Sequence, residues 1–80
     1  MSSCLNSLNQ MPIGSLGIVK ALTAKGFIYR RMLDLGLIYG TKVEALRRNS
    51  AGDLTAYQIR GAVIAFRLEE AEKVLVEQII

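Results

Sequence analysis

Short runs of alternating apolar and polar residues fill most of the chain, and turn-forming residues separate them. Val43 and Ala45 alternate with Lys42 and Glu44, and the same two-residue period continues through 54–60. This period places one side of a strand against a core and the other side in water. We therefore predict strands over 16–22, 41–47, 54–60, 62–66 and 74–79.

One segment follows a helical period instead. Ile28, Met32 and Leu35 are spaced at i, i+4 and i+7. They share one face of a helix over 27–35, and we expect that face to belong to the core. Gly36 follows where a helix commonly ends, because glycine adopts positive φ without a Cβ penalty.

The predicted order is strand, helix, three strands, a helical turn over 68–72 and a closing strand. This order lacks the long crossovers that parallel strands require. Five short strands can close antiparallel, which removes exposed edges. We predict a mainly β, five-stranded antiparallel barrel with one short helix and one helical turn. It would be a single domain over residues 1–80, with 1–7 frayed.

Glycines separate most of the predicted elements. We assign four of them to backbone geometry rather than to contact with a partner, because their turns need positive φ. These are Gly36, Gly40, Gly52 and Gly61. Asp53 follows one of them, and we expect its carboxylate to bond the backbone of its own turn.

The composition limits where such a protein works. The chain has 80 residues, 51% of them apolar, and its only cysteine is Cys4. An internal disulfide, the usual staple of a small secreted domain, is therefore excluded. The longest apolar stretch, 62–66, is too short to cross a bilayer. We expect a soluble, cytoplasmic protein without membrane insertion.

Catalytic and metal-binding side chains are scarce. The chain has no histidine, which removes the commonest general base, and one cysteine cannot build a zinc or iron–sulfur site. No phosphate-binding glycine motif is present. Four carboxylates could hold a hard metal weakly: Asp53, Glu69, Glu70 and Glu72. Glu69 and Glu70 better suit the start of the helical turn. We expect no catalysis, no cofactor and no dedicated metal site.

A series of short motifs follows one order along the chain. It begins with Arg-Arg-Met-Leu-Asp-Leu-Gly-Leu over 30–37 and Tyr-Gly-Thr-Lys-Val over 39–43. Later come Gly52-Asp53, Arg60-Gly61, Ala65-Phe66-Arg67 and Glu70-Ala71. Together, from about Leu8 to Ile79, they resemble the ferrous iron transport protein A (FeoA) family. Leu54 stands where that family often has proline, and Phe66 where it usually has leucine.

The resemblance implies an SH3-like barrel. It also implies a cytosolic accessory protein that regulates bacterial ferrous iron transport by binding the transporter FeoB, a membrane protein with a cytosolic GTP-binding domain. No nucleic-acid partner is implied. Whether the chain also self-associates stays open.

Two groups of residues are candidates for contact with that partner. Arg30 and Arg31 are adjacent and so point in different directions; Arg31 matches the family's arginine, and partner contact and an ion pair with Asp34 are equally weighted. Leu37, Ile38 and Tyr39 are apolar residues in a predicted loop. They form either a partner site or a lid over the barrel end. Arg67 is a further candidate, for which we favour a local salt bridge.

Two other functions are weighed. The first is a nucleic-acid-binding barrel, which the basic sequence pI of about 9.4 would favour. Five aromatic residues could stack on the bases. These are Phe27, Tyr29, Tyr39, Tyr57 and Phe66. The mixed signs of neighbouring charges argue against it. A weak metal sensor would use the carboxylates.

Overall fold

The computed structural model describes residues 5–79. They form six strands, two α-helices and one 3₁₀ turn. In chain order these are β1 (Leu5–Ser7), η1 (Leu8–Gln10), β2 (Leu16–Leu22), α1 (Gly26–Asp34), β3 (Lys42–Arg48), β4 (Leu54–Ile59), β5 (Ala62–Arg67), α2 (Leu68–Ala71) and β6 (Val74–Gln78).

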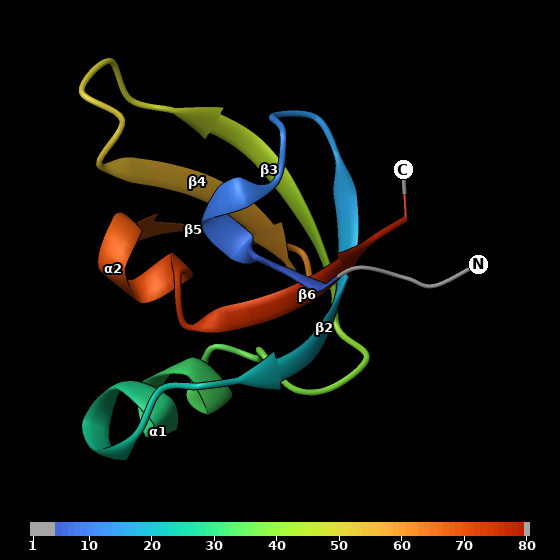
Figure 1. The fold of residues 1–80 in the computed structure, drawn as a ribbon, viewed down its shortest axis with the longest axis vertical. Helices are drawn as coiled ribbons and strands as arrows, with labels where there is room; N and C mark the ends of the chain where they lie inside the picture. The colour runs from blue at the N-terminus through green and yellow to red at the C-terminus, as the bar shows by residue number, and fades with distance from the viewer. Residues whose placement is uncertain (1–4, 80) are drawn as a thin grey trace.

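All six strands belong to one antiparallel sheet with the order β1-β6-β2-β3-β4-β5 (Figure 1). The predicted mainly β, antiparallel fold with two helical segments is confirmed. The prediction of a closed five-stranded barrel is wrong, because there are six strands and the sheet ends in two edges, β1 and β5.

The additional strand lies in the segment that we expected to be frayed. Leu5 pairs with Glu77 of β6, and Ser7 pairs with Leu75. A strand of three residues carries too little alternation to be recognised alone, and its partner lies at the far end of the chain. The expected fraying is therefore wrong for Leu5–Ser7; residues 1–4, with Cys4, lie outside the described part.

The strands bury the faces that the alternation predicts. Val43, Ala45 and Tyr57 are fully buried, whereas Lys42 and Gln58 are exposed. Register shifts at 45/47 in β3 and at 19/21 in β2 mark irregularities of the ladder. Such bulges bend a strand, so the sheet curves around its apolar side.

Helix α1 ends in a Schellman turn. The N–H of Leu37 donates to the carbonyl of Met32 and the N–H of Gly36 to that of Leu33, both at 3.0 Å. Gly36 has φ of +97° there, as the predicted helix stop requires. Met32 is buried and Leu35 packs against the core, but Ile28 is exposed, so the predicted buried stripe is only partly right.

The β4–β5 hairpin turns in two residues, Arg60 and Gly61, which have φ of 52° and 85°. These angles belong to a type I′ turn, which suits the twist of a hairpin. The side chain of Arg60 then crosses Gly36, where an added Cβ would lie 2.5 Å from Arg60 Cδ. The hairpin tip is thereby packed against the end of α1. Among the described residues, no helix has the length and apolar character needed to cross a membrane.

Candidate functional site

Four exposed apolar side chains gather on α1 and on the loop that follows it. Tyr29 and Leu33 belong to the helix, and Ile38 and Tyr39 to the loop. Their exposed fractions are 42%, 37%, 47% and 73%. We call these four residues the helix–loop patch. Exposed clusters of aromatic and aliphatic side chains commonly mark contact sites for other proteins.

The patch exists because α1 has more apolar residues than the core accepts. Met32 is the one fully buried residue of this helix. Tyr29 and Leu33 are an i, i+4 pair, so they form their own ridge beside Met32. Phe27 and Ile28 are also exposed, Phe27 to 91%, but they line a different hollow at the start of the helix, beside Arg31.

Hydrogen bonds hold the loop part of the patch in one conformation. The N–H of Ile38 donates to the carbonyl of Gly36 at 2.9 Å, and the N–H of Gly40 donates to Val19 at 2.8 Å. The hydroxyl of Thr41 donates to the carbonyl of Gly36 at 2.9 Å. With Leu37 turned inward, its neighbours Ile38 and Tyr39 face solvent on a loop that is tied to both α1 and β2.

A hollow of about 230 Å³ separates the patch from residues 19–22 of β2. Lys20 stands at its edge, with Nζ 5.2 Å from the centre of the Tyr39 ring and 3.3 Å from Glu77 Oε1. The hydrogen bond to Glu77, and then the nearby Tyr39, raise the pKa of Lys20 above its ordinary value. The patch therefore combines an apolar surface with one cation at its rim.

The structure separates the three loop residues that the sequence grouped. Leu37 is fully buried, so the lid interpretation holds for this residue. Ile38 and Tyr39 are exposed, and their contact with a partner stays a prediction. The sequence reasoning missed Tyr29, Leu33 and Lys20 as neighbours of Tyr39. The i, i+4 spacing of Tyr29 and Leu33 was the available signal.

The predicted arginines are distributed over the surface. Arg31 pairs with Glu70 of α2 and not with Asp34. Residues three apart on a helix can pair, but such a pair forms only where no stronger partner competes. Here Glu70 of α2 is that competing partner. Arg30 and Arg67 are exposed, and the backbone N–H of Arg67 donates to Glu70 Oε1 at 3.0 Å.

Two of the five aromatic residues proposed for base stacking are unavailable for it. Tyr57 and Phe66 are core residues whose ring centres lie 6.0 Å apart. The Tyr57 hydroxyl donates to the carbonyl of Leu8 at 3.2 Å, and burial raises the pKa of this phenol. The structure thus weakens the case for a stacking platform, which needs exposed aromatic faces.

The acidic residues do not assemble. Within residues 5–79, no group of three or more histidine, cysteine or acidic side chains converges on a point where a metal ion would fit. Asp53 Oδ1 accepts from the side-chain amide of Asn49 at 2.7 Å, and Asn49 Oδ1 accepts from the N–H groups of Gly52 and Leu54. The role in the turn that we expected of Asp53 therefore belongs to Asn49.

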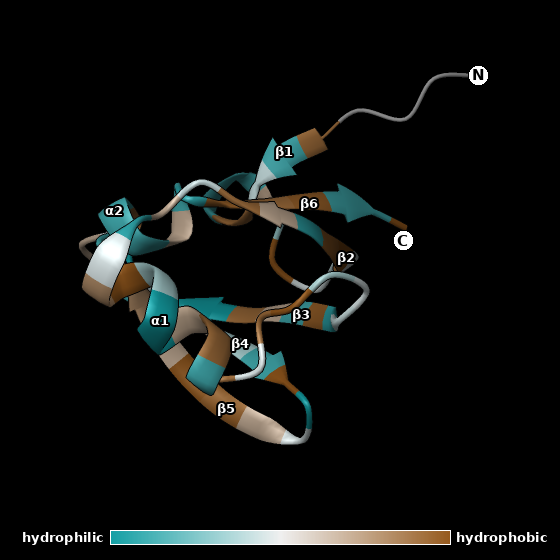
Figure 2. Cartoon of the chain, turned by 90° about the horizontal axis from the view of Figure 1, so that it is seen from below, coloured by the Kyte–Doolittle hydropathy of each residue, from teal (hydrophilic) through white to brown (hydrophobic). Residues whose placement is uncertain are grey.

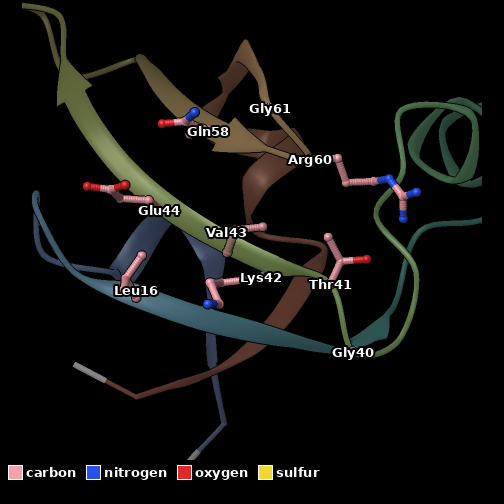
Figure 3. A pocket seen from close by; sticks show the side chains of 9 residues that line it. All are labelled: Leu16, Gly40, Thr41, Lys42, Val43, Glu44, Gln58, Arg60 and Gly61. Carbon is pink, nitrogen blue, oxygen red and sulfur yellow. The ribbon is translucent and has the colours of Figure 1, made fainter.

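A further hollow, about 590 Å³, lies on the outer face of the sheet (Figure 3). It is lined by Leu16, Gly40, Thr41, Lys42, Val43, Glu44, Gln58, Arg60 and Gly61. Lys42 and Glu44 alternate along β3, and Figure 3 shows Arg60 directed away toward α1. The residues that line this hollow carry charges of both signs and lie on a solvent-exposed face of the sheet. They form neither a nucleophile–base pair nor a binding site for an anion.

Known proteins place these features in a family. A sequence model described as the FeoA domain matches residues 6–78. Comparison with curated proteins finds no match.

Three solved structures are similar over most of the chain. A FeoA-like protein from Clostridium acetobutylicum is 28% identical with a TM-score of 0.89, over 100% of this chain and 92% of the other. FeoA from Chlorobium tepidum is 30% identical with a TM-score of 0.86, over 92% and 70%. FeoA from Stenotrophomonas maltophilia, solved with zinc and described as a prokaryotic SH3 domain protein, is 25% identical with a TM-score of 0.80, over 91% and 94%. The fold is thus SH3-like, and the chain belongs to the FeoA family, which is associated with ferrous iron transport.

Proposed function

We propose that this chain is a cytoplasmic accessory protein that regulates ferrous iron transport by binding the cytosolic part of the transporter FeoB. The helix–loop patch is the docking site in this proposal. The observation that carries it is the grouping of Tyr29, Leu33, Ile38 and Tyr39 on one exposed surface. A relative, the Stenotrophomonas maltophilia FeoA, is described as a candidate activating factor of ferrous iron transport.

The chemistry of the patch suits recognition of a protein. Tyrosine combines a large contact area with a polar tip and few rotatable bonds, and such residues dominate binding energy at interfaces. The hydrogen-bonded loop presents Ile38 and Tyr39 with little ordering left to do, which reduces the entropic cost of association. Lys20 at the rim, with its partner Glu77, gives the apolar surface a polar border, as protein interfaces commonly have.

The same residues offer no route to catalysis in this proposal. The chain has no histidine, and the hydroxyl of Thr41, next to the patch, donates to the carbonyl of Gly36 within the fold. The family is one of small accessory domains. The protein would act by shifting the transporter between states, which requires that it bind one state more tightly than another.

Calorimetric titration against the purified GTP-binding part of FeoB tests the proposal. The transporter part is used without nucleotide, with GDP and with a non-hydrolysable GTP analogue. We expect binding whose affinity depends on the nucleotide, and Tyr39→Ala to weaken it about tenfold or more, as hot-spot truncations do. Ile13→Ala is the control, because Ile13 is an exposed apolar residue (45%) that does not belong to the patch. Absence of binding under all three conditions would refute the proposal.

A further inference from the structure

Among residues 5–79, strand β5 has a partner strand on one side only. It is the last strand of the sheet, and β4 pairs with it from Ile59 and Ala62 at the turn to Leu54 and Arg67 at the far end. Figure 2 shows this strand as almost wholly hydrophobic. Its other side faces no strand of the described chain.

The register shows which backbone groups face outward. A two-residue turn makes Ile59 and Ala62 a hydrogen-bonded pair, so every second residue of β5 from Ala62 onward bonds β4. The N–H and C=O groups of Val63 and Ala65 therefore point away from β4. Within residues 5–79, no further hydrogen bond uses them.

The end of β5 confirms this assignment independently. Arg67 belongs to the outward-facing set, and its N–H is indeed taken by the side chain of Glu70 at 3.0 Å rather than by β4. The open edge thus consists of two residues, spaced two apart, with a donor and an acceptor each. An added antiparallel strand would bond these groups as hydrogen-bonded pairs.

The sequence of β5 carries one charge, Arg67, at its end. Residues 62–66 read Ala-Val-Ile-Ala-Phe, without a charge or a proline, and Val63 is 57% exposed. Sheet edges are usually blunted by charged residues, prolines, bulges or short length. β5 has six residues, whereas the opposite edge strand, β1, has three. The uncharged stretch before Arg67 is a template for strand addition.

The outer face beside Ala65 can receive a side chain. A hollow of about 230 Å³ lies there, lined by Leu54, Ala56 and Ala65 and bordered by Arg47 and Arg48. Directly paired residues of antiparallel strands point to the same face. A residue opposite Ala65 would therefore place an apolar side chain over this hollow, with cations at its border.

Charge argues against a second copy as the occupant. Symmetric pairing of two β5 strands would bring a second Arg67 to the edge and no carboxylate, because β5 has none. Arg60 takes no part in this contact, since its side chain packs against Gly36. A segment with a carboxylate opposite Arg67 would instead meet this arginine with opposite charge.

We propose that the β5 edge binds an extended segment of another protein as an added antiparallel strand. Its bonds go to Val63 and Ala65, an apolar side chain covers the hollow beside Ala65, and an acidic residue at its N-terminal end meets Arg67. This interface shares no residue with the helix–loop patch and does not depend on the transporter as partner.

A blocked peptide of sequence Glu-Thr-Leu-Thr-Val-Thr-Glu is the probe, titrated into the isotope-labelled full chain. We expect saturable shifts and slowed amide exchange centred on Val63 and Ala65. N-methylation of the peptide's Leu and Val amides removes two hydrogen bonds and should weaken binding about tenfold or more. A peptide with lysine at both ends is the charge control and should bind several-fold more weakly.

Two variants complete the test. Ala65→Pro removes an outward donor and leaves the bonds to β4, which an edge strand tolerates, so it should lose binding while its β4 amide signals stay in place. Arg67→Glu should reverse the preference between the glutamate and lysine peptides. Absence of shifts at β5, or equal binding of the N-methylated peptide, would overturn the proposal. Concentration-dependent shifts at β5 without peptide, with a doubled mass in sedimentation, would overturn it in favour of self-pairing.

Discussion

Arg31 in α1 forms an ion pair with Glu70 in α2, 39 residues further along the chain. Glu70 serves two partners at once, because its other oxygen, Oε1, accepts the backbone N–H of Arg67 at 3.0 Å. The carboxylate of Glu70 thereby caps the first turn of α2 and links α2 to α1. Arg31 thus has an ion-pair partner within the fold, and its predicted contact with another protein stays a prediction.

This arrangement predicts an acid-sensitive contribution to stability. Partial burial alone would raise the pKa of Glu70, but the N–H of Arg67 and the guanidinium of Arg31 outweigh it and hold this pKa below its ordinary value of 4.5. The stabilisation is therefore present above pH 4.5 and is lost as the pH falls through the lower, folded-state pKa.

Urea unfolding of the native chain and of Glu70→Gln at several pH values measures this effect. At neutral pH we expect the variant to be less stable by about 0.5–1 kcal/mol, since Arg31 is half exposed and solvent screens the pair. The difference should shrink below pH 4.5. When Arg31→Gln is also present, the stability difference caused by Glu70→Gln should be smaller at every pH. A difference that does not change with pH would contradict the role assigned to the Glu70 carboxylate.

A second prediction concerns Gly36. Its φ of +97° strains any side chain, and an added Cβ would also collide with Arg60 Cδ. Gly52→Ala is the matched control, because φ there is +80° with no atom within 4 Å. The control should cost about 1–2 kcal/mol for backbone strain alone. Gly36→Ala should cost slightly more, because the flexible side chain of Arg60 must also move, and Arg60→Ala should remove the excess. Equal costs in all backgrounds would show that Arg60 does not pack there.

A third prediction separates neighbours in the loop. Leu37→Ala should lower the free energy of unfolding by about 2–5 kcal/mol, because it empties a fully buried site. Ile38→Ala should change stability by less than about 1 kcal/mol and should weaken binding to the transporter. Thermal unfolding and the binding titration together give both values. A stability loss at Ile38 as large as that at Leu37 would make the loop a lid throughout.

Tyr57→Phe gives a fourth prediction. It removes the hydrogen bond to the carbonyl of Leu8, which ties β4 to η1, and should cost about 1 kcal/mol. The carbonyl keeps the N–H of Met11 at 3.2 Å, so it is not left unpaired. A loss of 3 kcal/mol or more, on the order of a buried unsatisfied group, would show that this bond matters more than its geometry suggests.

The sequence predicted local structure well because local periods decide it. The strand over 16–22 has the expected bounds, and the helix stop at Gly36 follows from glycine's tolerance of positive φ. β1 was missed because its partner, β6, lies about 70 residues away, and closure was assumed because nothing local specifies a sheet edge.

The contacts of the surface residues could not be predicted in the same way, because they depend on tertiary structure that the hydrophobic periodicity does not encode. Arg31 had a sequence neighbour, Asp34, of the right charge and spacing, but folding brought Glu70 closer. Leu37 and Ile38 are adjacent apolar residues, and only the Schellman turn decides which of them enters the core.

The central claim is that the helix–loop patch docks onto FeoB, and residue-resolved NMR mapping tests it most directly. The labelled chain is titrated with the transporter's GTP-binding part in each nucleotide state. The account predicts that the largest changes fall on Tyr29, Leu33, Ile38 and Tyr39. Binding that leaves these four signals unchanged, or no binding in any state, would contradict it.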